Sequence, residues 1–333
     1  MRLTNLSGKK VLVTGADGFI GSHLAERLVL EGARVRAFCF YNSQGSLGWL
    51  ETVAPEIRNE LDLQLGDIRD SRFVDQSCKD VEVAFHLAAL IAIPYSYIAA
   101  ESFVDTNIRG TLNVLEGARR SGVKRIVHTS TSEVYGTPAS IPIRETHPLN
   151  AQSPYAATKI AADQLALSYF QSFGTPVTVL RPFNAFGPRQ STRAVTATML
   201  VQLLSGKKEI SLGRLNTRRD LTYVSDVVDG FMRAGTVEEI EGKVIQLGTG
   251  RSVSIEELFN MACRVLGVRA TAISDTRRLR PDASEVLALQ SDPSRALELL
   301  GWKPTVALEE GLERTALWLR ENRKSYRPDF LYA

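Results

Sequence analysis

The sequence of 333 residues predicts an α/β protein with a parallel, doubly wound sheet. Through about residue 180, short apolar segments rich in β-branched residues alternate with helical patterns, the order that produces parallel strands covered by helices on both faces. Residues 10–14 form an apolar run typical of a buried strand, and Leu24, Leu28 and Val29 follow at helical spacing. A hydrophobic content of 44% allows a large core.

A glycine-rich turn joins this first strand to the helix. Gly15, Gly18 and Gly21 are spaced Gly-x-x-Gly-x-x-Gly. Gly15 permits the turn, Gly18 lets the backbone approach a pyrophosphate, and Gly21 packs the helix on the strand. The helix N-terminus, with Phe19 and Ile20 in its first turn, would then face the phosphates. The order strand, glycine turn, helix predicts a Rossmann-type dinucleotide site rather than an ordinary surface turn.

A second set of residues indicates the chemistry. Tyr155 and Lys159 are four residues apart and share one helix face, where the ammonium can lower the pKa of the phenol and make it a base. Thr131 supplies a hydroxyl that can bond to a substrate alcohol. Glu133 adds a carboxylate that simple alcohol oxidation does not require. An isolated Tyr-x-x-x-Lys is usually a chance surface pair, but here the set predicts a dehydrogenase that also breaks a C–H bond.

Together these motifs resemble the extended short-chain dehydrogenase/reductase family over nearly the whole chain. The resemblance implies that Asp67 and its neighbour Ile68 hold the adenine of the cofactor. It also implies that the backbone of Leu87, Ala88 and Ala89 passes the cofactor.

The second half carries the substrate signals of the same family. Arg219 and Arg280 begin stretches that resemble those in which arginine meets a nucleotide diphosphate and closes over the nucleotide. Arginine suits both places because its planar fork binds phosphate oxygens bidentately. Asn184 lies in a segment that resembles the loop meeting a nucleotide-sugar, and Arg189 and Arg193 follow it. The resemblance implies that these five residues contact substrate.

The family chemistries include epimerisation at C4, 4,6-dehydration and oxidative decarboxylation of a uronic acid. Epimerases typically lack the Glu, so Glu133 argues against simple epimerisation. In dehydration Tyr155, with Thr131 and Lys159, takes the C4 hydroxyl proton while the nicotinamide takes the hydride. Glu133 removes the C5 proton, Ser132 or Glu133 handles the leaving C6 hydroxyl, and the hydride returns to C6. The cofactor is regenerated in place.

The tripeptide 131–133 resembles that of GDP-mannose 4,6-dehydratases and of UDP-glucuronate decarboxylases, and does not separate them. dTDP-glucose 4,6-dehydratases have an Asp where this chain has Ser132. Segments 36–50 and 182–195 resemble the bacterial 4,6-dehydratases of N-acetylhexosamine nucleotides, which include the GDP-N-acetylglucosamine enzyme of the legionaminic acid pathway. The resemblance implies a 4,6-dehydratase of GDP- or UDP-N-acetylglucosamine that makes a 4-keto-6-deoxy sugar for surface glycans.

Two alternatives stay open. A UDP-glucuronate decarboxylase would need a cation for the C5 carboxylate, which Arg189 or Arg193 could supply. A non-catalytic NAD-binding sensor would keep the fold, but it has no need of a C5 base such as Glu133.

NAD is the predicted cofactor, with NADP as an alternative. An acidic residue at the end of the second strand usually bonds to the ribose diol of NAD. Cys39 stands at this position, and residues 40–43 lack the Arg or Lys that would hold a 2′-phosphate.

Composition restricts the partners. A net charge of +3 from 40 basic and 37 acidic side chains gives no case for nucleic acid. We expect no membrane association because no apolar stretch approaches the roughly 20 residues that span a bilayer, and no signal peptide precedes the first strand. Cys39, Cys78 and Cys263 and the four histidines show no metal-binding spacing. The predictions are no metal and a cytoplasmic protein.

Two further expectations concern organisation. Residues 1–180 should form mainly the cofactor-binding domain and residues 181–333 mainly a smaller substrate lobe, with elements exchanged between them because no linker separates them. The resemblance also implies a homodimer, in which the helix starting near residue 100 and the helix carrying Tyr155 form a four-helix bundle with their copies.

Overall fold

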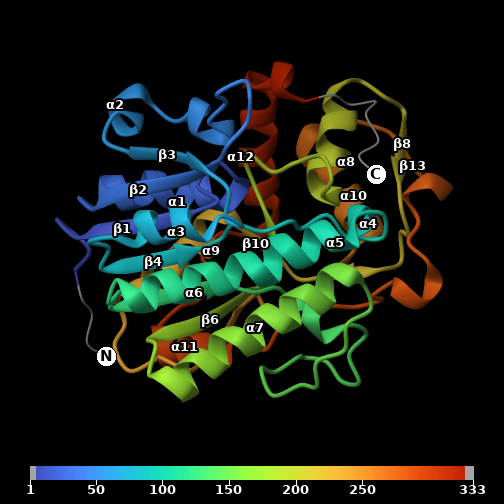
Figure 1. Ribbon diagram of the computed structural model, residues 1–333. Helices are drawn as coiled ribbons and strands as arrows, with labels where there is room; N and C mark the ends of the chain where they lie inside the picture. The colour runs from blue at the N-terminus through green and yellow to red at the C-terminus, as the bar shows by residue number, and fades with distance from the viewer. Residues whose placement is uncertain (1–4, 327–333) are drawn as a thin grey trace.

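The computed structural model describes residues 5–326, and its centre is a seven-stranded sheet in the order β11-β6-β5-β4-β1-β2-β3 (Figure 1). Every neighbouring pair in this sheet is parallel, so the predicted doubly wound α/β fold is confirmed. The strands are β1 (Lys10–Thr14), β2 (Arg34–Phe40), β3 (Asp62–Gly66), β4 (Val83–His86), β5 (Arg125–Thr129), β6 (Val177–Pro182) and β11 (Val244–Leu247).

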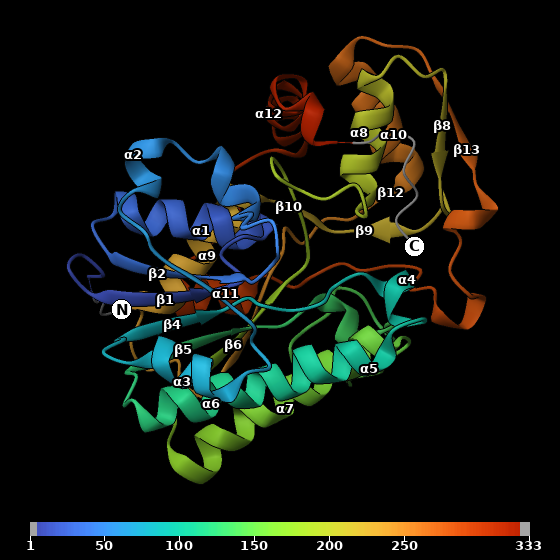
Figure 2. The same ribbon diagram turned by 45° about the horizontal axis from the view of Figure 1, so that its top comes forward.

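Helices cover both faces of the sheet (Figure 2). Side chains alternate along a strand, and in β1 Val11 and Val13 belong to one core cluster while Leu12 belongs to the other. On the Leu12 side lie α3 (Ser71–Cys78), α6 (Gly110–Arg120) and α7 (Pro154–Phe173). On the opposite side lie α1 (Phe19–Leu30), α9 (Val224–Thr236) and α11 (Ser294–Leu300).

The direction of chain progression reverses between β1 and β4, and a crevice at the carboxyl edge of such a sheet is the usual place for a ligand. The glycines of the first turn are explained by close packing here. Gly15 has φ +70°, and a Cβ on it would lie 2.9 Å from the Cα of Ala88. A Cβ on Gly21 would lie 2.1 Å from the carbonyl oxygen of Gly15. Both positions therefore require glycine.

Elements from the second half of the chain form a second lobe beside the carboxyl edge of the sheet (Figure 2). Its helices are α8 (Val195–Leu204), α10 (Ile255–Leu266) and α12 (Leu308–Glu321). Its short strand pairs are β7 (Asn184–Phe186) with β10 (Leu221–Tyr223), β9 (Arg218–Arg219) with β12 (Val253–Ser254), and β8 (Glu209–Leu212) with β13 (Thr271–Ser274). Because α9 and β11 return to the large sheet, the two halves of the chain share it. The division near residue 180 stays a prediction.

Candidate functional site

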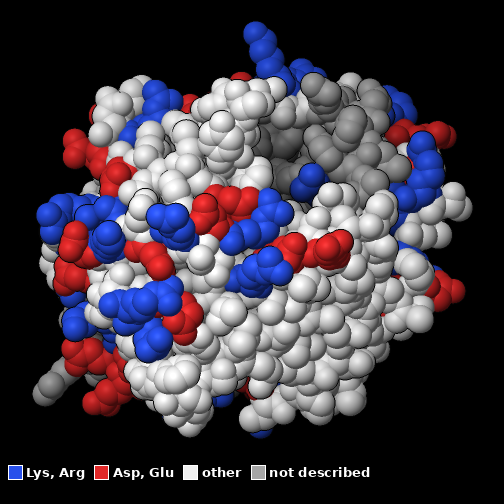
Figure 3. All heavy atoms as spheres, viewed as in Figure 1, with Lys and Arg blue, Asp and Glu red and all other residues white. Residues whose placement is uncertain are grey.

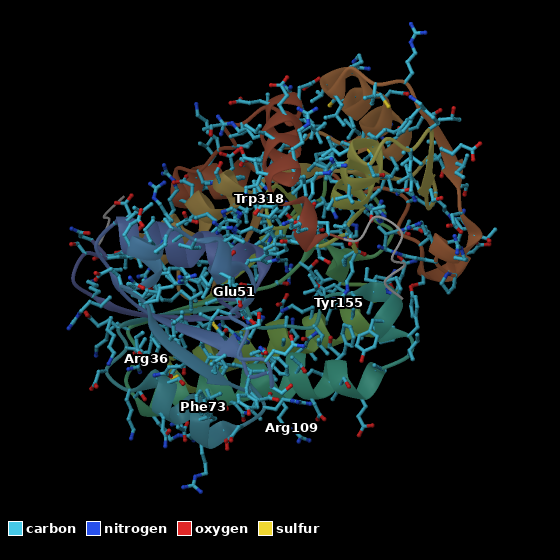
Figure 4. All side chains as sticks on the ribbon, turned by 90° about the horizontal axis from the view of Figure 1, so that it is seen from above. Arg36, Glu51, Phe73, Arg109, Tyr155 and Trp318 are labelled. Atoms are coloured by element: carbon cyan, nitrogen blue, oxygen red, sulfur yellow. The ribbon has the colours of Figure 1, made fainter. Side chains whose placement is uncertain are left out.

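Tyr155 and Lys159 lie at the start of α7, facing the carboxyl edge of the sheet. The hydroxyl of Ser153 caps the helix by accepting from the amide of Ala156, and Pro154 occupies the first turn. Tyr155 is 7% exposed and its phenol is hydrogen-bonded to the Thr131 side chain. Figure 4 shows Tyr155 between the large sheet and the second lobe.

The electrostatics of this pair correct one expectation. Burial raises the pKa of Tyr155 well above its usual value, the bond to Thr131 opposes this, and Glu133 raises it further. Burial lowers the pKa of Lys159 to about 8. The Lys159 ammonium donates to the carbonyl of Thr129 at 2.6 Å. The predicted lowering of the phenol's pKa by Lys159 is therefore wrong for the protein alone, since desolvation of the phenol is the larger effect.

Thr131, Ser132 and Glu133 form the turn that follows β5. Thr131 caps a short 3₁₀ helix, Ser132–Tyr135, by accepting from the amide of Glu133 at 3.3 Å. Ser132 and Glu133 are both buried, and Glu133 is 9% exposed. A carboxylate oxygen of Glu133 lies 3.9 Å from a guanidinium nitrogen of Arg280. The turn thus places a hydroxyl and a carboxylate beside Tyr155.

The second lobe brings the two predicted phosphate-binding arginines, Arg219 and Arg280, near the Glu133 carboxylate. Arg219, on β9, pairs with Glu285 at 3.2 Å, and Arg280 is 3.9 Å from the same oxygen. Burial lowers the pKa of Arg219, while the charge of Glu133 raises it. Nη1 of Arg280 is buried and has no hydrogen-bond partner among the described residues. The cluster therefore has a donor available for an anionic ligand.

Glu285 was not among the predicted site residues. It is the last residue of the stretch 280–285, which begins at Arg280 and carries the family resemblance. Its place in that stretch is the signal by which Glu285 could have been predicted.

The other three predicted substrate contacts are dispersed. Asn184 lies on β7, which pairs with β10, the strand that follows Arg219 in the chain. Its buried Oδ1 lacks a hydrogen-bond partner within residues 5–326. Arg189 instead reaches α1, where it pairs with Glu26 at 2.8 Å. The side chain of Arg193 is exposed. The structure does not bring Arg189 to the Arg219–Arg280 cluster.

The residues predicted to hold the cofactor line the carboxyl ends of β1, β3 and β4. The amides of Leu87 and Ala88 both donate to the hydroxyl of Thr14 at 3.1 Å, which fixes the segment that continues into Ala89. At the end of β3 the carboxylate of Asp67 is bound by Arg69. This pairing lowers the pKa of Asp67.

The rest of the dinucleotide-binding set follows the same edge. Ile68 is buried so close to α6 that a Cβ on Gly110 would lie 2.7 Å from it. Gly18 is the N-cap of α1, whose first residues are Phe19 and Ile20.

The end of β2 differs from the expectation for an NAD-binding fold. Burial raises the pKa of the Cys39 thiol to about 12, and the charge of Asp17 adds to the rise. Asp17, from the glycine-rich turn, accepts from the amide of Phe40 and so places a carboxylate at this strand end. Arg36 points elsewhere and pairs with Asp62 at 2.7 Å (Figure 4). No sequence pattern pointed to Asp17, because its place here depends on the folded turn.

Other site classes find no support within residues 5–326. No helix there combines the length and the hydropathy needed to cross a bilayer. That part of the chain also holds no group of three or more His, Cys, Asp or Glu side chains arranged to bind a metal ion.

With this geometry in place, comparison with known proteins identifies the family. Residues 12–315 match the model described as GDP-mannose 4,6 dehydratase. The chain belongs to this family. Its relatives include the UDP-glucose 4-epimerase of Mycolicibacterium smegmatis, 34% identical over 93% of this chain and 98% of the relative. They also include the dTDP-glucose 4,6-dehydratase of Actinoplanes sp., 32% identical over 94% of this chain and 98% of the relative.

Solved structures of the family agree in fold. The dTDP-glucose 4,6-dehydratase DesIV of Streptomyces venezuelae, with NAD and TYD bound, superposes with a TM-score of 0.83 at 30% identity, covering 96% of this chain and 99% of DesIV. MoeE5 in complex with UDP-glucuronic acid and NAD gives a TM-score of 0.84 at 30% identity, covering 94% and 99%. This chain is thus a member of a family that contains both nucleotide-sugar dehydratases and epimerases.

The different placements of Arg189 and Arg219 lead to a testable prediction. Arg189→Ala should lower the free energy of unfolding by about 1–3 kcal/mol, because it removes a charged hydrogen bond to Glu26, and should leave the KM for substrate unchanged. Arg219→Ala should raise KM. Urea denaturation and steady-state kinetics on both variants, with Glu26→Gln as the matched control, test this. A raised KM in Arg189→Ala alone would contradict the placement.

Proposed function

We propose that this protein is an NAD-dependent nucleotide-sugar 4,6-dehydratase acting on GDP- or UDP-N-acetylglucosamine. The observation that carries the proposal is the position of Glu133. Its buried carboxylate shares a turn with Thr131, acts on Tyr155 electrostatically, and lies 3.9 Å from Arg280. Oxidation at C4 alone does not need a second base, whereas elimination across C5 and C6 does.

The residues can be assigned to the steps in order. Bound at the carboxyl edge of the sheet, the nicotinamide would store the hydride that leaves C4 and return it to C6. Tyr155 must first be ionised, which burial opposes in the protein alone and the adjacent positive charge of Lys159 favours. As the phenolate it takes the C4 hydroxyl proton, and Thr131 bonds to the same oxygen. The C4 ketone acidifies the C5 proton, which Glu133 removes.

Loss of water completes the elimination. The C6 hydroxyl group needs a proton to leave as water. The Glu133 carboxyl group can donate the proton that it took from C5. Ser132 is buried in the same turn and can hydrogen-bond to the leaving oxygen. As the hydride adds to C6, a proton must return to C5, and Tyr155 can supply the one that it took from the C4 hydroxyl. The net change is loss of one water, with C4 oxidised and C6 reduced. The cofactor ends in its starting state.

Arg219 and Arg280 support a diphosphate substrate. They come from separate parts of the second lobe and meet at Glu285. Paired arginines match phosphate oxygens in both charge and geometry. The resemblance of segments 36–50 and 182–195 to bacterial 4,6-dehydratases of N-acetylhexosamine nucleotides is the basis for naming the N-acetylglucosamine nucleotides.

Two other family activities are less well supported. A uronate decarboxylase needs a cation for the C5 carboxylate. Arg189 is already paired with Glu26, which leaves Arg193 for that role, and the reaction gives Glu133 no task as a C5 base. A C4 epimerase, the activity in the name of the Mycolicibacterium relative, gives Glu133 no task. A non-catalytic sensor gives it none either.

NAD is favoured over NADP by the charge near the end of β2. The Asp17 carboxylate, bound to the amide of Phe40, would repel a 2′-phosphate placed there. The bound NAD in DesIV and MoeE5 agrees with this choice. The three cysteines are free, which fits the proposed cytoplasmic location.

We also propose a homodimer through α6 and α7. The 20-residue helix α7 contains two charged side chains, Lys159 and Asp163, and both are buried. Its outward residues are uncharged, among them Ala157, Gln164 and Gln171. Figure 3 shows a broad surface almost free of charge over this helix. An uncharged helix face of this kind suits packing against a second copy.

The first experiment identifies the reaction and the substrate together. Purified protein is incubated with GDP-, UDP- and dTDP-linked hexoses and N-acetylhexosamines and with UDP-glucuronate. The products are separated by chromatography, which resolves isomers, and their masses are measured by mass spectrometry. We expect loss of water from an N-acetylglucosamine nucleotide. Loss of carbon dioxide from UDP-glucuronate, or an isomer of unchanged mass, would contradict the dehydratase.

Replacing Glu133 by Gln tests the assigned base. We expect the rate of water loss to fall by about 10²–10⁴-fold, the range for a lost general base, with nucleotide binding retained. Deuterium uptake at C5 from heavy water should stop in the same variant. Ser132→Ala is the matched control and should keep C5 exchange. Normal turnover of Glu133→Gln would refute the assignment.

The dimer is tested by light scattering on the purified protein. We expect twice the chain mass for the wild type and the chain mass for Ala157→Glu/Gln164→Glu, which places two charges on the outward face of α7. Gln44→Glu, in an exposed loop outside that face, is the control. A monomeric wild type would refute the dimer.

A further inference from the structure

One fully buried carboxylate near the site has no part in the mechanism above. Asp163 lies on α7, one helical turn after Lys159, and is 0% exposed. Its Oδ2 accepts from the hydroxyl of Ser130 at 2.6 Å and from Arg181 at 2.8 and 3.1 Å. Its Oδ1 lies 3.2 Å from Nε2 of His128. A buried charge is stable only with such partners.

These partners belong to the strand ends that carry the rest of the site. Ser130 immediately precedes Thr131, so the bond to Asp163 fixes the start of the catalytic turn. Arg181 lies near the end of β6 and also donates to the Tyr135 hydroxyl, at the far end of that turn, at 3.0 Å. One carboxylate therefore sets the position of α7 relative to β5 and β6.

Asp163 also faces Lys159 within the same buried region. The other titratable groups around Lys159 are His86 on β4, His128 on β5, Tyr155 on α7 and Arg181 on β6. Burial lowers the pKa of both histidines, and the Lys159 charge lowers each further, so both are neutral near neutral pH. Arg181 is a cation, and the raised pKa of Tyr155 keeps its phenol neutral. Asp163 is therefore the anion that acts on Lys159.

We infer that Asp163 is a positioning residue that keeps Lys159 charged and in place for the chemistry at C4. It acts through Lys159 and the turn at Thr131, and it touches neither the substrate nor the cofactor. The inference rests on the proposed function in one respect only, because the kinetic test measures the rate of the proposed reaction.

The expected pH dependence follows from the sign of the charge. Burial lowers the pKa of Lys159 to about 8, and Asp163 opposes this fall. Removing the Asp163 charge therefore lowers the pKa of Lys159 further, so a rate that needs the ammonium is lost at a lower pH. A carboxylate that served only to hold the fold together would change the amplitude of the profile and leave its alkaline limb in place.

The test compares pH profiles of turnover for the wild type, Asp163→Asn, Asp163→Glu and Ser130→Ala. Asp163→Asn should move the alkaline limb down by about one pH unit. Because the pKa of Lys159 is about 8, the rate should fall about fivefold at pH 8 and about tenfold well above it, since one unit of pKa is a tenfold change. Asp163→Glu should restore the limb. Ser130→Ala, which removes a hydrogen bond and keeps the charge, should leave the limb unmoved.

A folded Asp163→Asn variant with an unmoved alkaline limb would overturn the inference. If that variant does not fold, Asp163→Asn/Arg181→Gln, which leaves neither charge unpaired, is judged by the same criterion. A substrate-independent readout separates this inference from the proposed function. Nitrogen NMR titration of Lys159, with its signal assigned by loss in Lys159→Arg, should show a lower pKa without the Asp163 charge. An unchanged pKa would overturn the inference even if no nucleotide-sugar reacts.

Discussion

The close approach of the turn after β1 to the segment after β4 is the constraint on which the rest of the site depends. The turn at Gly15 passes so near Ala88 that a side chain at Gly15 would strike the neighbouring backbone. The hydroxyl of Thr14 draws the two segments together by accepting both the Leu87 and Ala88 amides, and His86 bonds to the same hydroxyl at 2.8 Å. This contact lies where the strand order reverses, at the carboxyl edge of the sheet where ligands usually bind.

The sequence was informative wherever a short-range pattern determines structure. The predicted first strand has the observed bounds, and the four-residue spacing placed Tyr155 and Lys159 on one buried helix face. Gly301, at φ +60° after the last residue of α11, ends that helix in the left-handed conformation that glycine favours. Each of these features depends on residues that are close together in the chain.

The features that the sequence did not reveal depend on distant contacts. Arg189 lies in a loop without periodicity, and its partner Glu26 stands far back on the first helix. Asp17 reaches the end of β2 only because the glycine turn folds back on it. The Tyr-x-x-x-Lys-x-x-x-Asp spacing would have put Asp163 on the face of Lys159, but its partners are Arg181 on β6 and Ser130 just after β5. A pattern read along one helix does not identify them.

The position of β11 has a consequence for how the chain folds during synthesis. This strand covers the outer edge of β6, yet it is made after the first lobe helix and the β8–β10 region have emerged. Until then β6 has an open hydrogen-bonding edge of the kind that pairs with other chains. The large sheet therefore cannot be completed on the ribosome before α8 and the β8–β10 region have emerged. Such long-range strand pairing slows folding and extends the interval in which a chaperone can protect the nascent chain.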